Sequence, residues 1–375
     1  MQSSLAAHMR RGGKPAILVS AMALALMFML TPTGGATDTN KLQQRLDELV
    51  ATGVPGAILL VHTGDKTVRL TSGYANLKGK TRPRANERFR VGSLTKTFLS
   101  AVILHLVDEG RLTLGDTVER WLPGVVPNGE NITIRQLLNM KAGLYDYPND
   151  PRIEADFVNG NWAHKWQPTE LAEIGVSHKP LFAPGKGWSY CNTCYVLAGL
   201  IIEKVTGNPV GAELKQRIFT PLRLRGTTFD SERRIAGRYV HGYFRKGKQL
   251  IDTSLLTPSW AWAAGAVVST VDDIATFYRA LLQGQVIKPE LLAEMQATVA
   301  AYSPTERYGL GLAQFPSPCG QLWGNGGDIV GYNSSAYASK DGKRQFVLFV
   351  NLDEMSFTKK IAGALGRVSL AAFCG

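Results

Sequence analysis

Strand-like apolar segments occupy both ends of this chain, whereas its middle reads as helices and long loops. The expected strands cover residues 54–61, 67–74, 308–313, 329–338 and 345–351. Expected helices cover residues 41–50, about 270–282 and 359–373. Because distant segments must then share one sheet, we expect an α/β (α+β) fold whose antiparallel sheet is built from both chain ends and flanked by helices.

The same pattern predicts the domain organisation. Residues 37–115 and 270–375 are expected to form the sheet domain, and residues 116–269 an inserted, mostly helical lobe. A length of 375 residues with 45% hydrophobic content allows a large buried core. The cleft is expected between the two parts.

Residues 1–36 have the features of a signal peptide. Arg10, Arg11 and Lys14 precede the apolar run 16–30, and small residues follow it. A membrane anchor is the alternative, but the run is shorter than the roughly 20 residues that a spanning helix needs. A secreted or periplasmic protein is therefore expected.

Export permits disulfides, and the chain has four cysteines. We expect Cys319 to pair with Cys374, which would fasten the C-terminus to the sheet. Cys191 and Cys194 lie three residues apart at an expected helix start. For this second pair a strained disulfide, half of a metal site and two free thiols all remain open, whereas a thioredoxin-like redox role is not expected.

The formal charge is +12, of which three positive residues belong to the signal peptide. The remaining positive charge is spread along the chain, and it would attract anionic cell-wall or membrane polymers. Neither a zinc-finger spacing nor an RNA-binding signature occurs, so a nucleic-acid partner is not expected.

A Ser-x-x-Lys motif at Ser93 and Lys96 begins an apolar, helix-like run over residues 98–107. Residues three apart share a helix face, so Lys96 is expected to reach Ser93. A neutral lysine can accept the serine proton and activate the hydroxyl as a nucleophile. We expect the dipole of the helix start to lower the pKa of Lys96. An ordinary helix cap is the alternative, and Ser356 and Lys359 repeat the spacing.

A Tyr-x-Asn motif at Tyr190 and Asn192 follows a Pro-Gly loop and precedes an expected helix. Its hydroxyl would relay the proton between Ser93 and the leaving group if Lys96 lowers the pKa of the phenol. Asn192 is expected to hold Lys96 and the substrate amide. The motif also occurs twice elsewhere, and a tyrosine packed under a loop is the alternative interpretation.

A glycine-rich run from Trp323 to Asp328 is the third candidate. We interpret it as a turn that lets a substrate approach the backbone. The strand expected after it, 329–338, would supply one N–H of an oxyanion hole, and Ser93 the other. A plain hairpin turn and a phosphate loop are the alternatives, but no Lys-Ser or Lys-Thr follows.

Other enzyme signatures are missing from the sequence. There is no Gly-x-Ser-x-Gly elbow and no His-Glu-x-x-His motif. The six histidines have no metal-ligand spacing. No metal or cofactor is therefore expected.

In their order, the three motifs resemble the Ser-x-x-Lys, Tyr-x-Asn and His/Lys-x-Gly signatures of the serine penicillin-recognising enzymes. The resemblance is to the class C β-lactamase and D-alanyl-D-alanine carboxypeptidase branch, with the soluble secreted carboxypeptidases looking closest. It implies the β-lactamase/D,D-peptidase-like fold. It also implies Ser93 as the acylated nucleophile, Lys96 and Tyr190 as proton carriers, Asn192 as a substrate contact and Trp260 as a wall of the cleft.

Three positions depart from the carboxypeptidase pattern. Asn325 replaces the usual histidine or lysine, Asp328 stands where a hydroxyl residue would bind the substrate carboxylate, and Ala313 stands where relatives carry arginine. Asn325, Gly327 and Asp328 remain expected substrate contacts. A carboxylate about 4 Å from Asp328 would be repelled by about 1 to 4 kcal/mol, depending on the local dielectric.

The expected activity is acyl-enzyme hydrolysis of D-amino-acid peptides, as in D-alanyl-D-alanine carboxypeptidases and β-lactamase-like enzymes. The expected partners are peptidoglycan-type or D-amino-acid peptide or amide substrates, with β-lactams as acylating ligands, and a monomer is expected. One alternative is a D-stereospecific aminopeptidase, amidase or esterase, in which Asp328 would bind the substrate ammonium. The other is a non-catalytic penicillin-binding-like protein.

Overall fold

The computed structural model describes residues 38–303 and 305–375. The predicted signal peptide, residues 1–36, lies outside the described residues. Within the described part, no helix combines the length and the apolar character that a bilayer-crossing segment requires.

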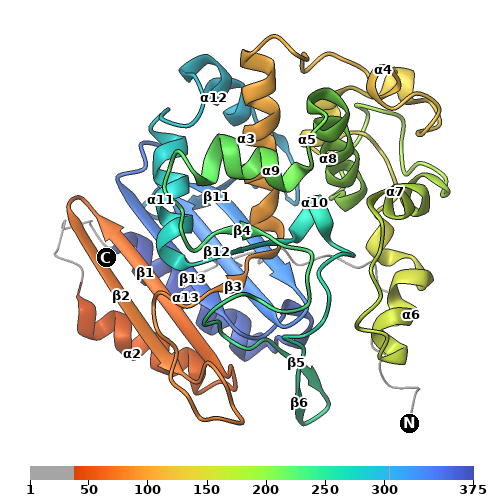
Figure 1. Ribbon diagram of the computed structural model, residues 1–375. Coiled ribbons are helices and arrows are strands. Elements are labelled where there is room, and N and C mark those ends of the chain that lie inside the picture. The colour runs from red at the N-terminus through yellow and green to blue at the C-terminus, as the bar shows by residue number, and fades with distance from the viewer. Residues whose placement is uncertain (1–37, 304) are drawn as a thin grey trace.

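Eight strands form one antiparallel sheet in the order β2-β1-β13-β12-β11-β10-β9-β8 (Figure 1). Strands from both chain ends meet where β1 pairs with β13, one strand in from the β2 edge. The fold predicted from the sequence is therefore confirmed. The strands of this sheet are β1 Gly56–Thr63, β2 Lys66–Gly73, β8 Val299–Ala300, β9 Arg307–Tyr308, β10 Ala313–Ser317, β11 Gly320–Ile329, β12 Tyr332–Ala338 and β13 Arg344–Val350.

Two smaller sheets and the helices complete the molecule. The small sheets consist of β3 Phe89–Arg90, β7 Val267–Ser269 and β4 Thr228–Phe229, and of β5 Tyr243–Lys246 and β6 Gln249–Asp252. The helices are α2 Thr39–Val50, α3 Thr95–Asp108, α4 Val118–Trp121, α5 Ile134–Leu138, α6 Pro151–Asn159, α7 Pro168–Val176, α8 Asn192–Thr206, α9 Val210–Leu214, α10 Trp262–Gly265, α11 Val271–Leu282, α12 Pro289–Gln296 and α13 Lys359–Cys374. Further helical turns are η1 Gly92–Leu94, η2 Gly129–Asn131, η3 Tyr147–Asn149, η4 Lys215–Phe219 and η5 Glu354–Ser356.

Three strand predictions need correction. The expected strand 329–338 is two segments, because β11 ends at Ile329 and β12 begins at Tyr332. The expected strand 308–313 is mostly a turn between β9 and β10. Four short strands also occur between residues 228 and 269, in the stretch expected to be helical. The domain boundaries themselves stay a prediction.

Helices cover both faces of the main sheet. Helices α2 and α13 pack against each other and against strands of one face, while α11 packs on β1, β12 and β13 from the other (Figure 1). Each helix has an apolar stripe at helical spacing, so its buried side faces the sheet. The buried residues of these stripes include Leu42, Leu46 and Leu49 in α2 and Ile274, Phe277 and Leu281 in α11.

Helix α3 joins the sheet to the helical part. It is apolar on nearly every side and almost wholly buried, as expected for a helix surrounded by other elements. It packs against α8 and α10, while η1, just before it, packs against β11 and β12. The start of α3 therefore lies where strands and helices meet.

Both cysteine pairs form disulfides. Cys319 bonds to Cys374, as predicted, and links the β10–β11 turn to the end of α13. Cys191 bonds to Cys194 at the start of α8, which decides between the three states that the sequence left open.

Candidate active site

Ser93 lies in η1, directly before α3, and its side chain is partly exposed. Gly92 makes this position possible, because it has φ 55° and a Cβ there would lie 2.6 Å from the Asp328 carbonyl oxygen. Gly327 is equally constrained, since its Cβ would lie 2.0 Å from the Val91 oxygen. Glycine at both positions lets the backbone before Ser93 approach β11 closely.

Lys96 reaches Ser93 as the motif spacing predicts. Its Nζ lies 2.9 Å from Ser93 Oγ, 2.7 Å from Asn192 Oδ1 and 2.8 Å from the Ala264 carbonyl oxygen. The lysine side chain is completely buried. The amine is therefore held by three oxygen atoms from three separate elements.

Burial lowers the pKa of Lys96 to about 7, although the nearby Asp146 carboxylate raises it in part. The sequence predicted the direction of this change from the helix dipole. The structure shows that removal from water is the larger cause, because the charged amine loses its hydration. A substantial fraction of Lys96 is then neutral at physiological pH.

Tyr190 also meets Ser93. Its hydroxyl donates a hydrogen bond of 2.6 Å to Ser93 Oγ. The expected lowering of the phenol pKa is wrong: burial raises the pKa of Tyr190 well above its ordinary value. Tyr190 is therefore a neutral phenol that can donate a proton to the Ser93 oxygen or to a leaving group.

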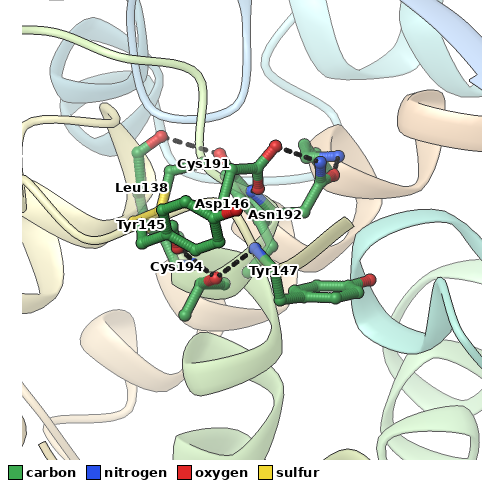
Figure 2. The surroundings of a disulfide bond; sticks show 10 residues. Leu138, Tyr145, Asp146, Tyr147, Cys191, Asn192 and Cys194 are labelled. Carbon is green, nitrogen blue, oxygen red and sulfur yellow. Dashed lines mark hydrogen bonds between the residues drawn. A yellow bond between two sulfur atoms is a disulfide. The ribbon is translucent and has the colours of Figure 1, made fainter. Parts of the chain in front are cut away.

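Asn192, the first residue of α8, contacts Lys96 through its side-chain oxygen. On its other side it meets the buried carboxylate of Asp146 (Figure 2). Its backbone N–H donates to Asp146 Oδ1 at 2.6 Å and its side-chain Nδ2 to Asp146 Oδ2 at 3.0 Å. Burial raises the pKa of Asp146 to about 6, despite these hydrogen bonds. The carboxylate is thus mainly ionised at neutral pH and lies at the start of a 15-residue helix, where negative charge is favoured.

The glycine-rich run is a strand and not a turn. Residues 323–328 belong to β11, and the turn comes after Ile329. The backbone that lies beside Ser93 is therefore β11 itself: a Cβ on Gly92 would lie 2.8 Å from the Asp328 nitrogen. The oxyanion-hole N–H that we expected from segment 329–338 has to be sought in β11.

The Asn325 side chain is buried and contacts core groups. Its Nδ2 donates to the Gly311 carbonyl at 3.3 Å and lies 3.5 Å from Thr97 Oγ1. The residue is 2% exposed. These contacts anchor β11 to α3, and a direct substrate contact of Asn325 stays a prediction.

Asp328 lies at the end of β11 among carboxyl groups. Its Oδ1 accepts hydrogen bonds from the Glu354 N–H at 2.7 Å and from Asn333 Nδ2 at 3.5 Å. Burial and the nearby Asp353 carboxylate raise the pKa of Asp328 to about 7. Burial and both aspartates raise the pKa of Glu354 to about 9. Within residues 38–303 and 305–375, no hydrogen bond reaches Asp328 Oδ2.

Two groups of aromatic side chains include Trp260 and Tyr190. Trp260 packs edge-on against Phe157, with ring centres 5.3 Å apart. Tyr302 packs against Trp188, and its ring centre lies 6.4 Å from that of Tyr190. The role of Trp260 as a cleft wall stays a prediction. Ala313 lies buried in β10, opposite Gly324.

Two groups of the site were missed by sequence reasoning. Asp146 follows an apolar segment and stands between two tyrosines. A single acidic residue in a segment that is expected to be buried could have indicated a functional carboxylate. The Ala264 carbonyl had none, because any residue supplies a backbone oxygen. Both act on Lys96 only after segments distant in sequence have packed together.

The buried amine predicts a specific pH dependence. If neutral Lys96 accepts the Ser93 proton, the rate of Ser93 acylation falls about tenfold per pH unit below about pH 7 and levels off above it. The rate of labelling by a fluorophosphonate, followed by intact mass across this pH range, tests the prediction. A rate that does not change with pH across the range would contradict it.

Comparison with known proteins shows similarity across nearly the whole folded region. The family model named "Beta-lactamase" matches residues 42–367. Penicillin-binding protein 4* from Bacillus subtilis (strain 168) is 29% identical over 325 residues, which cover 80% of this chain and 68% of that protein.

Solved structures with a similar fold include two amide hydrolases. A D-stereospecific amidohydrolase from Streptomyces sp. is 40% identical, with a TM-score of 0.80, over 87% of this chain and 98% of its own. D-amino acid amidase from Ochrobactrum anthropi SV3 is 29% identical, with a TM-score of 0.79, over 88% of this chain and 97% of its own. The similarity is thus not limited to the three motifs.

Proposed function

The chain belongs to the beta-lactamase family of serine hydrolases, and from this membership and the site geometry we propose that it hydrolyses D-amino-acid amides and short peptides through an acyl-enzyme on Ser93. The observation that carries the proposal is the position of Ser93 Oγ, 2.9 Å from a buried amine and 2.6 Å from a phenol. The names of the two similar amide hydrolases support the choice of substrate class.

The proposed reaction has two acyl-transfer steps. Ser93 Oγ attacks the substrate carbonyl carbon while its proton passes to neutral Lys96. The bond from carbon to the leaving nitrogen then breaks, and that nitrogen receives a proton through Tyr190. Water attacks the acyl-serine with the same groups acting in reverse, which releases the acid and restores the Ser93 hydroxyl.

Asp328 supports a substrate with a free amino group. It belongs to β11, which lies against the backbone before Ser93, and its Oδ2 receives no hydrogen bond from the described residues. Its charge also influences the nearby Tyr190 hydroxyl. In its ionised form, which prevails above about pH 7, this carboxyl group would attract a substrate ammonium and repel a substrate carboxylate.

D-alanyl-D-alanine carboxypeptidase activity is the second candidate. The similarity to Penicillin-binding protein 4* favours it, and β-lactams would then be expected to acylate Ser93. Asp328 argues against it, because the substrate of a carboxypeptidase carries a free carboxylate that must be neutralised.

Substrate comparison decides between the two candidates. We expect D-alaninamide to be hydrolysed faster than a peptide ending in D-Ala-D-Ala, and faster than L-alaninamide. Asp328→Asn should raise the KM for D-alaninamide roughly tenfold or more, the scale of a hydrogen bond to a charged group. N-acetyl-D-alaninamide, which lacks the ammonium, is the matched control and should respond much less. Faster release of D-alanine from the D-Ala-D-Ala peptide would defeat the proposal.

Export is part of the proposal. Residues 1–36 have the sequence features of a signal peptide, and the two disulfides support an oxidising compartment. The positive net charge would favour contact with anionic wall polymers there. Amino-terminal sequencing of the protein recovered from the culture medium or periplasm tests for cleavage near residue 36.

A further inference from the structure

Asp146 is a buried carboxylate that the proposed reaction does not use directly. It is 5% exposed and lies at the start of α8, where both of its oxygens accept hydrogen bonds from Asn192 (Figure 2). Its backbone is held independently. The Tyr147 N–H donates to Thr193 Oγ1 at 3.1 Å, and that hydroxyl donates to the Tyr145 carbonyl at 2.6 Å. The position of Asp146 therefore does not depend on its own side chain alone.

The carboxylate determines which way the Asn192 amide faces. An ionised carboxylate can only accept hydrogen bonds, so it must face the Nδ2 of Asn192 and not its oxygen. The Asn192 oxygen then necessarily faces Lys96, 2.7 Å from Nζ. A neutral residue at position 146 would not impose this orientation.

The amide orientation in turn determines where the lone pair of neutral Lys96 points. A neutral amine has two N–H donors and one lone pair. Asn192 Oδ1 at 2.7 Å and the Ala264 carbonyl at 2.8 Å can only accept, so they take the two N–H groups. The lone pair is left facing Ser93 Oγ at 2.9 Å, which is the geometry that a proton acceptor requires.

We propose that Asp146 is a positioning residue: by fixing the Asn192 amide it directs the lone pair of Lys96 at the Ser93 hydroxyl, and its negative charge moves to higher pH the point at which that lone pair becomes available. The inference rests on the proposed function, because it assumes that Lys96 accepts the Ser93 proton. Asp146 lies outside the three motifs, and the inference adds it to the residues that control proton transfer from Ser93.

Asp146 is also the charged group whose field acts on Lys96. In the described part of the chain, the phenols of Tyr190 and Tyr195 also face the amine, with ring centres 4.9 Å and 5.5 Å from Nζ. Burial raises the pKa of both phenols well above the ordinary value, so they stay neutral. Asp146 raises the pKa of Lys96, and removing its charge must therefore make the amine neutral at lower pH.

Asp146→Asn tests the inference. The amide introduced at position 146 would place a donor against Asn192 Nδ2, so one of the two amides must rotate and the lone pair of Lys96 loses its direction. We expect the maximal rate of Ser93 acylation by a fluorophosphonate to fall about 10- to 100-fold, part of what a general base contributes. The acid limb of the pH profile should move to lower pH by about one unit.

Asp150→Asn is the matched control. Asp150 is also a buried acid of the same loop, but its partners are Arg152 and His178, away from Lys96. This variant should keep the wild-type acid limb, and Asp146→Glu, which retains the charge, should return the limb to the wild-type pH. Should Asp146→Asn fail to fold, Asp146→Ser removes the charge and is measured in the same way.

The outcomes distinguish a failure of the Asp146 inference from a failure of the proposed function. A displaced acid limb in the charge-removing variant, with the limb of Asp150→Asn unmoved, supports the positioning role. A lower rate with an unmoved limb means that Asp146 is only structural and overturns the inference. If the wild-type protein is not labelled at Ser93 at any pH, the proposed function itself fails.

Discussion

Replacement of Ser93 by alanine is expected to abolish acylation and to lower kcat/KM for D-alaninamide by at least about 10⁴-fold. Loss of the nucleophile removes the acyl-enzyme route completely, and such losses in serine hydrolases are on the order of 10⁶-fold. The fold should survive, because the Ser93 side chain is partly exposed and its polar contacts are with Lys96 and Tyr190.

Ser356→Ala is the control for this prediction. Ser356 and Lys359 repeat the motif spacing, but Ser356 Oγ donates to Asp353 Oδ1 at 2.8 Å and accepts from the Arg245 N–H at 2.8 Å. Lys359 is exposed. Intact mass after incubation with a fluorophosphonate should show one adduct in the wild-type protein and in Ser356→Ala, and none in Ser93→Ala. An adduct in Ser93→Ala would place the nucleophile elsewhere and defeat the assignment.

The contrast between these two serines shows what the sequence could predict. Spacing alone gives Ser93 and Ser356 the same chance of meeting a lysine. The long apolar segment after Ser93 indicated a core helix there, and no such segment follows Ser356. The structure shows that this helix buries Lys96 and that burial lowers the pKa of the amine. Local periodicity was therefore enough to select the candidate nucleophile and its candidate base.

The prediction failed where tertiary packing overrides local preference. A glycine-rich run normally indicates a turn, but in β11 the glycines are needed for close packing within a strand. A Cβ on Gly324 would lie 1.9 Å from the Ala336 oxygen, and one on Gly327 would lie 2.0 Å from the Val91 oxygen. These neighbours come from β12 and from the segment before η1, so no local signal could identify them.

The prediction that Tyr190 lies beside Ser93 depended more on the resemblance to a known family than on the local sequence pattern. Its hydroxyl meets a serine 97 residues earlier in the chain, a contact for which periodicity gives no information. The state of its phenol was wrongly predicted for the same reason. Only the packed structure shows that burial, and not the neighbouring lysine, decides the pKa of Tyr190.

Removal of the Cys319–Cys374 disulfide is expected to destabilise the protein more than removal of the Cys191–Cys194 disulfide. The bond closes a loop of 55 residues, and its loss would lower the free energy of unfolding by roughly 4 kcal/mol in the loop-entropy model. It also releases the end of α13, which packs against α2 and β13. Guanidinium unfolding of Cys319→Ser/Cys374→Ser against the wild-type protein measures the loss.

The Cys191–Cys194 disulfide supplies the matched comparison. It spans three residues, for which the same model gives roughly 2 kcal/mol. Serine can also replace Cys191 as the N-cap of α8, where its sulfur accepts the Cys194 N–H at 3.0 Å. We therefore expect Cys191→Ser/Cys194→Ser to lose less than half as much stability as the other pair. Equal losses would show that loop length does not govern these bonds. Asn192 lies between these two cysteines and contacts Lys96, so this variant should alter the acylation rate more than Cys319→Ser/Cys374→Ser does.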